Sequence, residues 1–239
     1  MNIQPNQTVG EIVAKDYRTA SVFKAHGIDF CCKGGRTLAE ACAQKQLDTE
    51  RLIAELEQVS TAGGSGVPDF DSWPMDLLVD YIEKKHHRYV EARLPEILQY
   101  LDKLCKVHGE SHPELFEIKE EFSKAAGELA AHMKKEELVL FPYIRKMVAE
   151  AHPAPPMFGT VKNPIAMMVH EHAVEGERFE HIAQLTNQYT PPADGCTTYR
   201  VAFSMLKEFE EDLHMHIHLE NNILFPKAIE RETLMSSTS

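Results

Sequence analysis

Two matching phrases contain the residues of this sequence whose types and spacing could do chemistry. Both have the pattern H-x3-E-x3-L-F-P, one from His132 to Pro142 and the other from His216 to Pro226, 84 positions further along. Because four residues of an α-helix turn through about 400°, the histidine and glutamate of each phrase share a face, roughly 6 Å apart along the axis. The repeat therefore predicts two equivalent pairs of side chains that point at one place.

A histidine and a glutamate that are buried together lose their hydration, and a metal ion compensates for that loss. His172 lies 44 positions before His216, and His87 lies 45 positions before His132, so each half reads as a histidine followed by His-x3-Glu. Six ligands are too many for one tetrahedral zinc ion and suit two ions about 3.5–4 Å apart that share bridging carboxylates. Imidazole and carboxylate without thiolate favour iron, with manganese or zinc as alternatives. The predicted ligands are His87, His132, Glu136, His172, His216 and Glu220.

Periodicity alone leaves the first of these ligands ambiguous. His86 shares a helix face with Ile82 and Val90, whereas His87 shares a face with Leu94. The spacing between the two halves fits His87 slightly better, so we choose His87. The other histidines, His214 and His218 among them, are expected on other faces.

The segments that must position these residues have the period of α-helices. We predict four long helices at about 75–104, 114–148, 164–187 and 197–231, with breaks between them that contain Gly and Pro. No run rich in Val or Ile alternates with period two. Four helices joined by short connections predict an all-α fold whose main part, residues 73–239, is an antiparallel four-helix bundle.

A smaller helical domain is expected at residues 1–60, around the adjacent Cys31 and Cys32. Residues 61–72 are rich in Gly, Ser and Pro and predict a flexible linker. The two cysteines are either small packing residues or a thiol pair that receives or hands over iron or nitric oxide. In the second case the nearby Lys33 and Arg36 would favour the reactive thiolate.

Composition excludes several classes of function. The net charge of −12 over 239 residues disfavours binding to nucleic acid or to a membrane surface. Five cysteines, two of them adjacent, make a poor disulfide framework. The polar start of the chain has neither the basic nor the apolar part of a secretory signal, and no stretch is long and apolar enough to cross a bilayer. We therefore expect a cytoplasmic protein.

These motifs resemble those of a known family, the iron–sulfur cluster repair di-iron proteins of the YtfE/ScdA type, whose bundle is hemerythrin-like. The resemblance covers nearly the whole chain and rests on His87…Leu94-Pro95-Glu96, His132-x3-Glu136, Glu171-His172 and His216-x3-Glu220-Asn221-Asn222. It implies a non-haem, oxo-bridged di-iron centre with four terminal histidines and two bridging glutamates: His87, His132, His172, His216, Glu136 and Glu220. It also favours His87 over His86.

The first domain is similar to the accessory domain of that family, which is marked by a Cys-Cys pair followed by glycines. Here the run is Cys31-Cys32-Lys33-Gly34-Gly35, with Lys33 where a glycine often stands. Glu171 precedes a predicted ligand, and we weigh two interpretations of it: a hydrogen-bond partner of the site, or a surface carboxylate, which is slightly favoured.

The resemblance implies repair of iron–sulfur clusters after nitrosative or oxidative stress, with damaged iron–sulfur proteins as partners and nitric oxide or oxygen species as small ligands. Iron donation is the leading hypothesis. The alternatives are an enzyme that reduces nitric oxide to nitrous oxide and a reversible sensor of nitric oxide or oxygen. The sequence leaves open whether the protein is an enzyme and whether it forms a homodimer.

Overall fold

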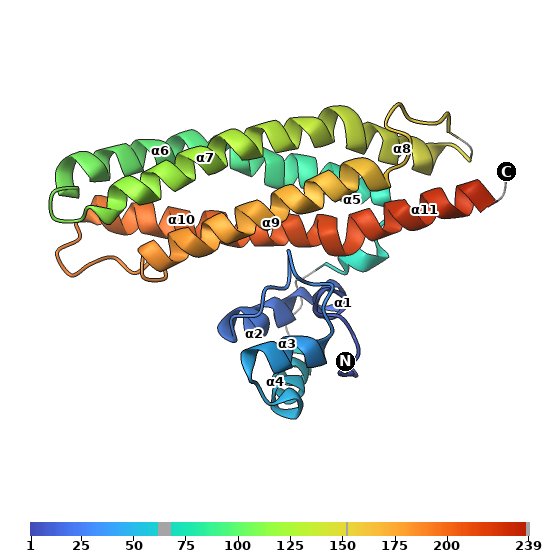
Figure 1. Ribbon diagram of the computed structural model, residues 1–239, viewed down its shortest axis with the longest axis horizontal. Helices are drawn as coiled ribbons and strands as arrows, with labels where there is room; N and C mark the ends of the chain where they lie inside the picture. The colour runs from blue at the N-terminus through green and yellow to red at the C-terminus, as the bar shows by residue number, and fades with distance from the viewer. Residues whose placement is uncertain (62–67, 152, 238–239) are drawn as a thin grey trace.

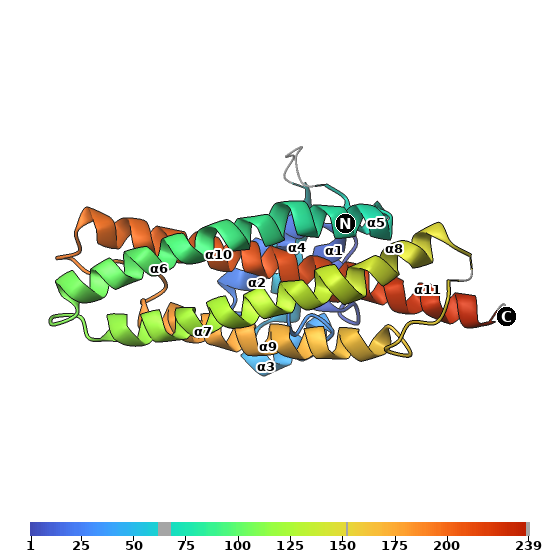
Figure 2. The same cartoon turned by 90° about the horizontal axis from the view of Figure 1, so that it is seen from above.

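The computed structural model describes residues 1–61, 68–151 and 153–237, and in this part of the chain it contains helices and no strand. The main body is a bundle of four long antiparallel rods (Figures 1 and 2). Three of the rods contain a short π-helical segment, in which the backbone bonds reach one residue further than in an α-helix. The rods are α5 Met75–Tyr81, Ile82–His87 and α6 Arg88–His108; α7 Glu114–Lys135, Glu136–Leu140 and α8 Phe141–Ala149; α9 Lys162–Leu185; and α10 Thr197–Leu219, Glu220–Leu224 and α11 Phe225–Ser237. The all-α prediction and the bundle are thereby confirmed.

A small helical domain precedes the bundle and lies against its middle (Figure 1). Two of its helices begin with a capping box. The hydroxyl of Thr8 or Thr37 accepts from the backbone N–H of the glutamate three residues later, and the carboxylate of that glutamate accepts from the threonine backbone N–H. The helices of this domain are α1 Val9–Lys15, α2 Ala20–Ala25, α3 Leu38–Lys45 and α4 Thr49–Thr61.

The predicted linker, 61–72, falls partly outside the described residues, which omit 62–67. Its last part is packed: Phe70 is buried in the 3-10 turn Phe70–Ser72. The Phe70 ring lies 4.8 Å from the ring of Trp73 and 5.3 Å from that of Tyr81. An aromatic cluster therefore fixes the entry into the bundle.

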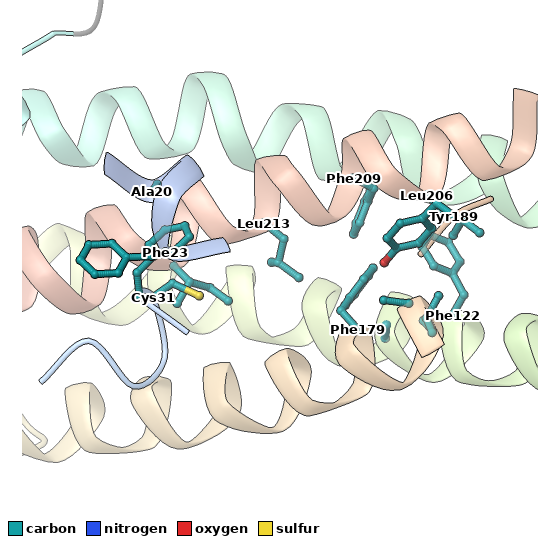
Figure 3. Packing of buried hydrophobic residues seen from close by; sticks show 14 of the residues in the cluster. Ala20, Phe23, Cys31, Phe122, Phe179, Tyr189, Leu206, Phe209 and Leu213 are labelled. Atoms are coloured by element: carbon teal, nitrogen blue, oxygen red, sulfur yellow. The ribbon is translucent and has the colours of Figure 1, made fainter. Parts of the chain in front are cut away.

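Two apolar clusters fill the molecule and leave a polar layer between them. One joins the interior of the N-terminal domain to α6, α7, the second half of α9 and α10. There the rings of Phe122 and Phe209 pack edge to face at 5.4 Å, with Phe179 beside them (Figure 3). The other joins α5, α8, the first half of α9 and α11 around Phe141 and Phe225. Burial of each such ring stabilises the fold by about 2–3 kcal/mol. The two apolar clusters therefore fix the rods on both sides of the polar layer.

The three π-helical segments all lie at this polar layer. Two of them end two residues before Pro142 and Pro226, where N–H groups of Phe141 and Phe225 reach back five residues to carbonyls of Glu136 and Glu220. A proline ring clashes with the carbonyl four residues earlier, and a wider turn relieves that clash. The Leu-Phe-Pro triplets thus widen the helix just after each glutamate. The segment Ile82–His87 has no proline that would explain it.

None of the helices in the described part of the chain combines the length and the apolarity that a membrane span requires.

Candidate metal centre

The six predicted ligands converge in the polar layer, one or two from each rod of the bundle. Their side chains form two groups, and within each group four ligand atoms lie within 4.8 Å of one another. Glu136 and Glu220 belong to both groups. The first group adds His87 and His216, and the second adds His132 and His172. Two carboxylates common to two pairs of imidazoles are the arrangement that a pair of cations with bridging carboxylates requires.

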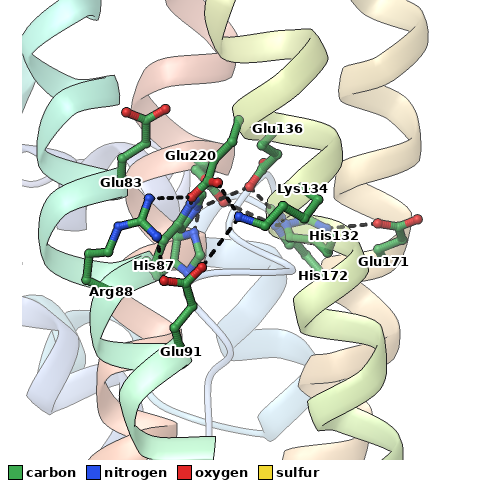
Figure 4. Close-up of polar contacts among 12 residues, drawn as sticks. Glu83, His87, Arg88, Glu91, His132, Lys134, Glu136, Glu171, His172 and Glu220 are labelled. Atoms are coloured by element: carbon green, nitrogen blue, oxygen red, sulfur yellow. Dashed lines mark hydrogen bonds and ion pairs between the residues drawn. The ribbon is translucent and has the colours of Figure 1, made fainter.

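Each of the four imidazoles directs its Nε2 atom at a carboxylate, and Figure 4 shows His87, His132 and His172 beside Glu136 and Glu220. Nε2 of His132 lies 3.3 Å from Glu136 Oε2, and Nε2 of His216 lies 3.1 Å from Glu220 Oε1. Nε2 of His87 lies 3.4 Å from Glu136, and Nε2 of His172 lies 3.2 Å from Glu220.

These groups are buried, and several of their polar atoms have no hydrogen-bond partner in the described part of the chain. Glu136 and Glu220 are fully buried, and the four histidines predicted as ligands are at most 3% exposed. Both oxygens of Glu136, Oε2 of Glu220 and Nε2 of His87 have no hydrogen-bond partner within the described residues. Buried carboxylate oxygens without hydrogen-bond partners are costly, and cations placed between the two glutamates would remove that cost. The donor set therefore fits metal ions of the iron, manganese or zinc type.

The ambiguity between His86 and His87 has a clear structural outcome. His87 lies in the first group, whereas His86 lies outside both groups, with Nδ1 3.0 Å from Asp212 Oδ2. His86 is also buried, and its ring stacks on that of His216 at 5.6 Å. The two neighbours therefore face different sides of the same rod, one toward the carboxylates and the other toward Asp212.

Three of the four histidines are oriented by a partner on Nδ1, the ring atom that faces away from the carboxylates. Nδ1 of His87 lies 3.1 Å from Glu137 Oε1, and Nδ1 of His132 lies 2.8 Å from Glu171 Oε2. A carboxylate can only accept, so these Nδ1 atoms carry the proton and leave Nε2 with a lone pair for a cation. Glu171 is thus a hydrogen-bond partner of the site, the interpretation that the sequence favoured less.

The partner of His172 is an amide. Asn221 Oδ1 lies 2.9 Å from Nδ1 of His172. Sequence reasoning missed both Glu137 and Asn221, although the repeat contains the signal that could have found them. Each directly follows a shared glutamate, and each orients the histidine of the preceding rod. His216 differs, because its Nδ1 is buried without a hydrogen-bond partner in the described part of the chain.

In the metal-free protein, His132 holds an extra proton, whereas the two shared glutamates are ionised. Burial opposes the charged form of His132, but Glu136, Glu220 and Glu171 outweigh burial and raise its pKa to about 10. Burial likewise raises the pKa of Glu220, but His216 and His172 outweigh it and hold that pKa well below its usual range. The ionised carboxylates can therefore bind a cation, which must compete with the proton on His132.

A cavity of about 200 Å³ leads to the second group between α7 and α9. Its lining includes His132, His172, Glu171 and a further carboxylate, Glu175, which is 3% exposed. Burial and the neighbouring Glu128 raise the pKa of Glu175 to about 7, although Arg178 acts against them. The cavity is thus lined by three carboxylates, those of Glu128, Glu171 and Glu175, together with Lys135.

The family comparison agrees with this geometry. Residues 78–228 match the family described as the hemerythrin HHE cation binding domain, and residues 5–60 match ScdA_N, described as a domain of unknown function. The iron-sulfur cluster repair protein YtfE of Yersinia pestis (strain Pestoides F) is 35% identical over 227 residues, 95% of this chain and 98% of its own. The protein of that name from Yersinia pseudotuberculosis serotype O:1b (strain IP 31758) is 34% identical over the same shares.

The chain belongs to the YtfE family of iron–sulfur cluster repair proteins. The predicted resemblance is confirmed, and a cation-binding hemerythrin-type domain is part of the protein. The part of this YtfE-family chain that matches ScdA_N includes both adjacent cysteines.

The cysteine pair of this YtfE-family protein lies at the interface between the two domains. Backbone N–H groups of Cys31 and Cys32 both donate to Asp29 Oδ1, at 3.0 and 2.9 Å. The two Sγ atoms lie 3.7 Å apart, and with Asp29 they form a third group able to hold a cation. Cys32 Sγ donates to the backbone carbonyl of His172 at 3.2 Å. The pair therefore touches the backbone of a predicted ligand.

The expectation that Lys33 and Arg36 favour a thiolate is wrong for Cys31. Its hydrogen bond with Cys32, together with burial and the charge of Asp29, raises the pKa of the Cys31 thiol well above its usual range. A 3% exposed sulfur has little solvent to stabilise a negative charge.

The N-terminal domain is docked on α10 rather than extended from the bundle. Lys24 Nζ lies 2.9 Å from Glu210 Oε2. The Phe30 ring packs against His214 and His218, both at 6.0 Å. Burial lowers the pKa of His218 to about 3, so that this ring packs as a neutral group. His214 and His218, which the sequence predicted to lie on other helix faces than the ligands, thus form part of the surface on which the first domain docks.

Proposed function

We propose that this protein repairs iron–sulfur clusters damaged by nitrosative or oxidative stress by supplying iron from a two-ion site. The observation that supports the proposal most is that Glu136 and Glu220 belong to both four-residue groups. The named activity of the Yersinia relatives agrees with it. Iron is here the cargo, and damaged iron–sulfur proteins are the recipients.

We assign each residue of the site one of three roles: terminal ligand, bridge, or partner that orients a ligand ring. We propose His87, His132, His172 and His216 as terminal ligands, and Glu136 and Glu220 as bridges. A bound pair of iron ions would supply exchangeable positions for nitric oxide or oxygen species, with an oxo bridge between them. Glu137, Glu171 and Asn221 orient the rings, and the acidic cavity at Glu175 gives a cation a polar route to the second group.

The position of Cys32 beside a proposed ligand supports a part for the thiol pair in iron transfer. Cys32 lies half-buried and bonded to the His172 carbonyl, in a cavity of about 320 Å³ between the domains. We propose that Cys31 and Cys32 assist the passage of iron from the bundle to the recipient. Five free thiols suit a reducing compartment, so we place the activity in the cytoplasm. A homodimer is compatible with the proposal and not required by it.

Repair of a nitric-oxide-damaged [4Fe–4S] enzyme tests the proposal. Iron-loaded protein should restore the enzyme, while apoprotein and the Glu136→Gln variant should not, because neither holds two iron ions. Equal repair by apoprotein would refute iron donation. Steady nitrous oxide production with an electron donor would instead show a nitric oxide reductase, and ligand uptake without iron loss would show a sensor.

A serine variant of both cysteines tests the thiol role in the same assay. Unimpaired repair by the Cys31→Ser, Cys32→Ser double variant would end that part of the proposal. Its iron content, measured beforehand, separates lost transfer from lost binding.

A further inference from the structure

One side chain in the bundle touches a predicted ligand and the N-terminal domain at once. Asn221 Oδ1 lies 2.9 Å from Nδ1 of His172, while its Nδ2 donates to the backbone carbonyl of Cys31 at 3.2 Å. The equivalent residue of the other half, Glu137, orients His87 but is bonded to Lys134 and Arg88 of the bundle itself. Within the described residues, Asn221 thus links the domains in the half of the site that contains His172, and Glu137 makes no such link in the other half.

The Cys31 carbonyl determines which way the Asn221 amide must face. A carbonyl oxygen only accepts, so the NH₂ group of Asn221 must point to Cys31, and its oxygen must point to His172. Nδ1 of His172 then has to donate, and its Nε2 lone pair is directed into the group with His132. With the loop undocked, the amide could turn over and offer NH₂ to Nδ1, which would place the proton on Nε2, where it blocks a cation.

We propose that Asn221 is a positioning residue through which the docked Cys31–Cys32 loop controls the ion held by His132 and His172, and that the ion held by His87 and His216 is not under this control. The inference rests on the proposed two-ion site and adds its regulation. Docking of the loop keeps His172 in its binding tautomer, and undocking by a recipient protein would loosen one ion of the pair.

A second contact joins the same loop to the same ligand. Cys32 Sγ donates to the carbonyl of His172, and it fits there because residue 176 of α9 is glycine. A Cβ at Gly176 would lie 2.9 Å from that sulfur. Gly176→Ala would therefore displace the sulfur from the His172 carbonyl and weaken the docking of the loop without touching Asn221. Because coupling between two sites is reciprocal, a cation at His172 must in turn favour the docked loop.

Zinc titration of the full-length apoprotein against a chromophoric chelator tests whether the loop controls ion binding through Asn221. The wild type should take two ions. Asn221→Leu should lower the zinc affinity of one site by about 10–100-fold, as loss of an orienting partner does. The affinity of the other site should stay within about threefold of wild type. Asn221→Asp keeps the acceptor for His172 and should hold both ions.

Asn222→Ala is the matched control. Asn222 also ties the domains together, donating to the Phe30 carbonyl at 3.1 Å, but its other partner is His218, which is not a predicted ligand. Its zinc affinities should stay within about threefold of wild type, because the Asn221–Cys31 and Cys32–His172 contacts that hold the Cys31–Cys32 loop remain. If Asn222→Ala weakens an ion as much as Asn221→Leu, or if Asn221→Leu binds both ions normally, the inference is overturned.

Hydrogen exchange of the backbone amides of residues 28–34 tests reciprocity. Zinc should slow their exchange in the wild type, and it should not do so in Asn221→Asp, whose carboxylate cannot donate to Cys31. Gly176→Ala should weaken one zinc ion in the wild-type background and have no effect on zinc in the Asn221→Asp background. Failure of the wild type to bind two ions would overturn the proposed site itself. Binding of two ions without any slowing of amide hydrogen exchange at residues 28–34 would overturn only the control by the loop.

Discussion

His86 and His87 are consecutive and both buried, yet His86 binds Asp212 at 3.0 Å while His87 binds Glu137 at 3.1 Å and directs Nε2 at Glu136. We therefore expect His87→Ala to retain one metal ion of two and His86→Ala to retain both. Metal analysis of the purified variants measures this. Loss of an ion from His86→Ala, with full retention by His87→Ala, would reverse the assignment.

The two shared glutamates should behave unlike the histidines. Glu136 and Glu220 each belong to both groups, so Glu136→Gln or Glu220→Gln should weaken both ions, whereas His132→Ala or His216→Ala should weaken mainly one. Zinc titrations that resolve two binding steps measure the difference. A glutamine variant that loses a single ion would show that its glutamate is not shared.

Much of this architecture is predictable from local sequence. Four helix-period segments give the bundle, and the duplicated His-x3-Glu phrase places four side chains on inward faces before any tertiary contact is considered. His86 and His87 were hard to separate because the rod widens into a π-helical segment at Ile82–His87. In such a turn the 100° step between residues no longer holds, so α-helical periodicity cannot decide between neighbours.

What the sequence could not supply are contacts between distant segments. The pairing of Asn221 with Cys31 joins residues 190 positions apart, and no local pattern encodes it. The composition of residues 61–72 predicted a flexible linker, but it did not predict that Phe30 docks between His214 and His218. Docking depends on the fit of two surfaces, which hydrophobic periodicity does not describe.

Metal binding should release protons. The pKa of His132 is raised to about 10 in the metal-free protein, so the ring is protonated at pH 7, and a cation can use Nε2 only after that proton leaves. Zinc affinity should therefore rise with pH between about 6 and 9, by up to tenfold per unit for each proton released. Calorimetric titration in two buffers of different ionisation enthalpy counts the protons. His181→Gln, at an exposed ion pair with Glu117, should not change the count; zero release from the wild type would contradict the prediction.

Glu175 should make the stability of the apoprotein depend on pH. Its pKa of about 7 in the folded state lies above the ordinary 4.5 because the side chain is buried, so the folded state binds its proton more tightly than the unfolded state. The stabilisation is complete below about pH 4.5 and is lost as the pH rises to about 7. Glu175→Gln removes this loss, and its advantage over wild type should grow by about 2 kcal/mol from pH 5 to pH 8. Urea unfolding at both pH values measures it, and an unchanged difference would contradict the pKa.

The five thiols should react in an order that follows their surroundings. Cys196 is exposed before α10, where the backbone at Tyr199 and the His108 ring, 3.2 Å from Sγ, lower its pKa to about 7. About half of it is then thiolate at pH 7, against about 1% for a thiol of pKa 9, so it should be alkylated tens of times faster than an ordinary cysteine. Cys31, buried and with a raised pKa, should be the slowest of the interface pair.

Peptide mapping after brief iodoacetamide treatment gives that order. His108→Ala should slow the labelling of Cys196, because the ring no longer stabilises the thiolate, and Cys196→Ser should abolish the fast phase altogether. Labelling of Cys31 as fast as that of Cys196 in the folded protein would mean that the loop opens readily, and the docked arrangement on α10 would then describe only a minor part of the population.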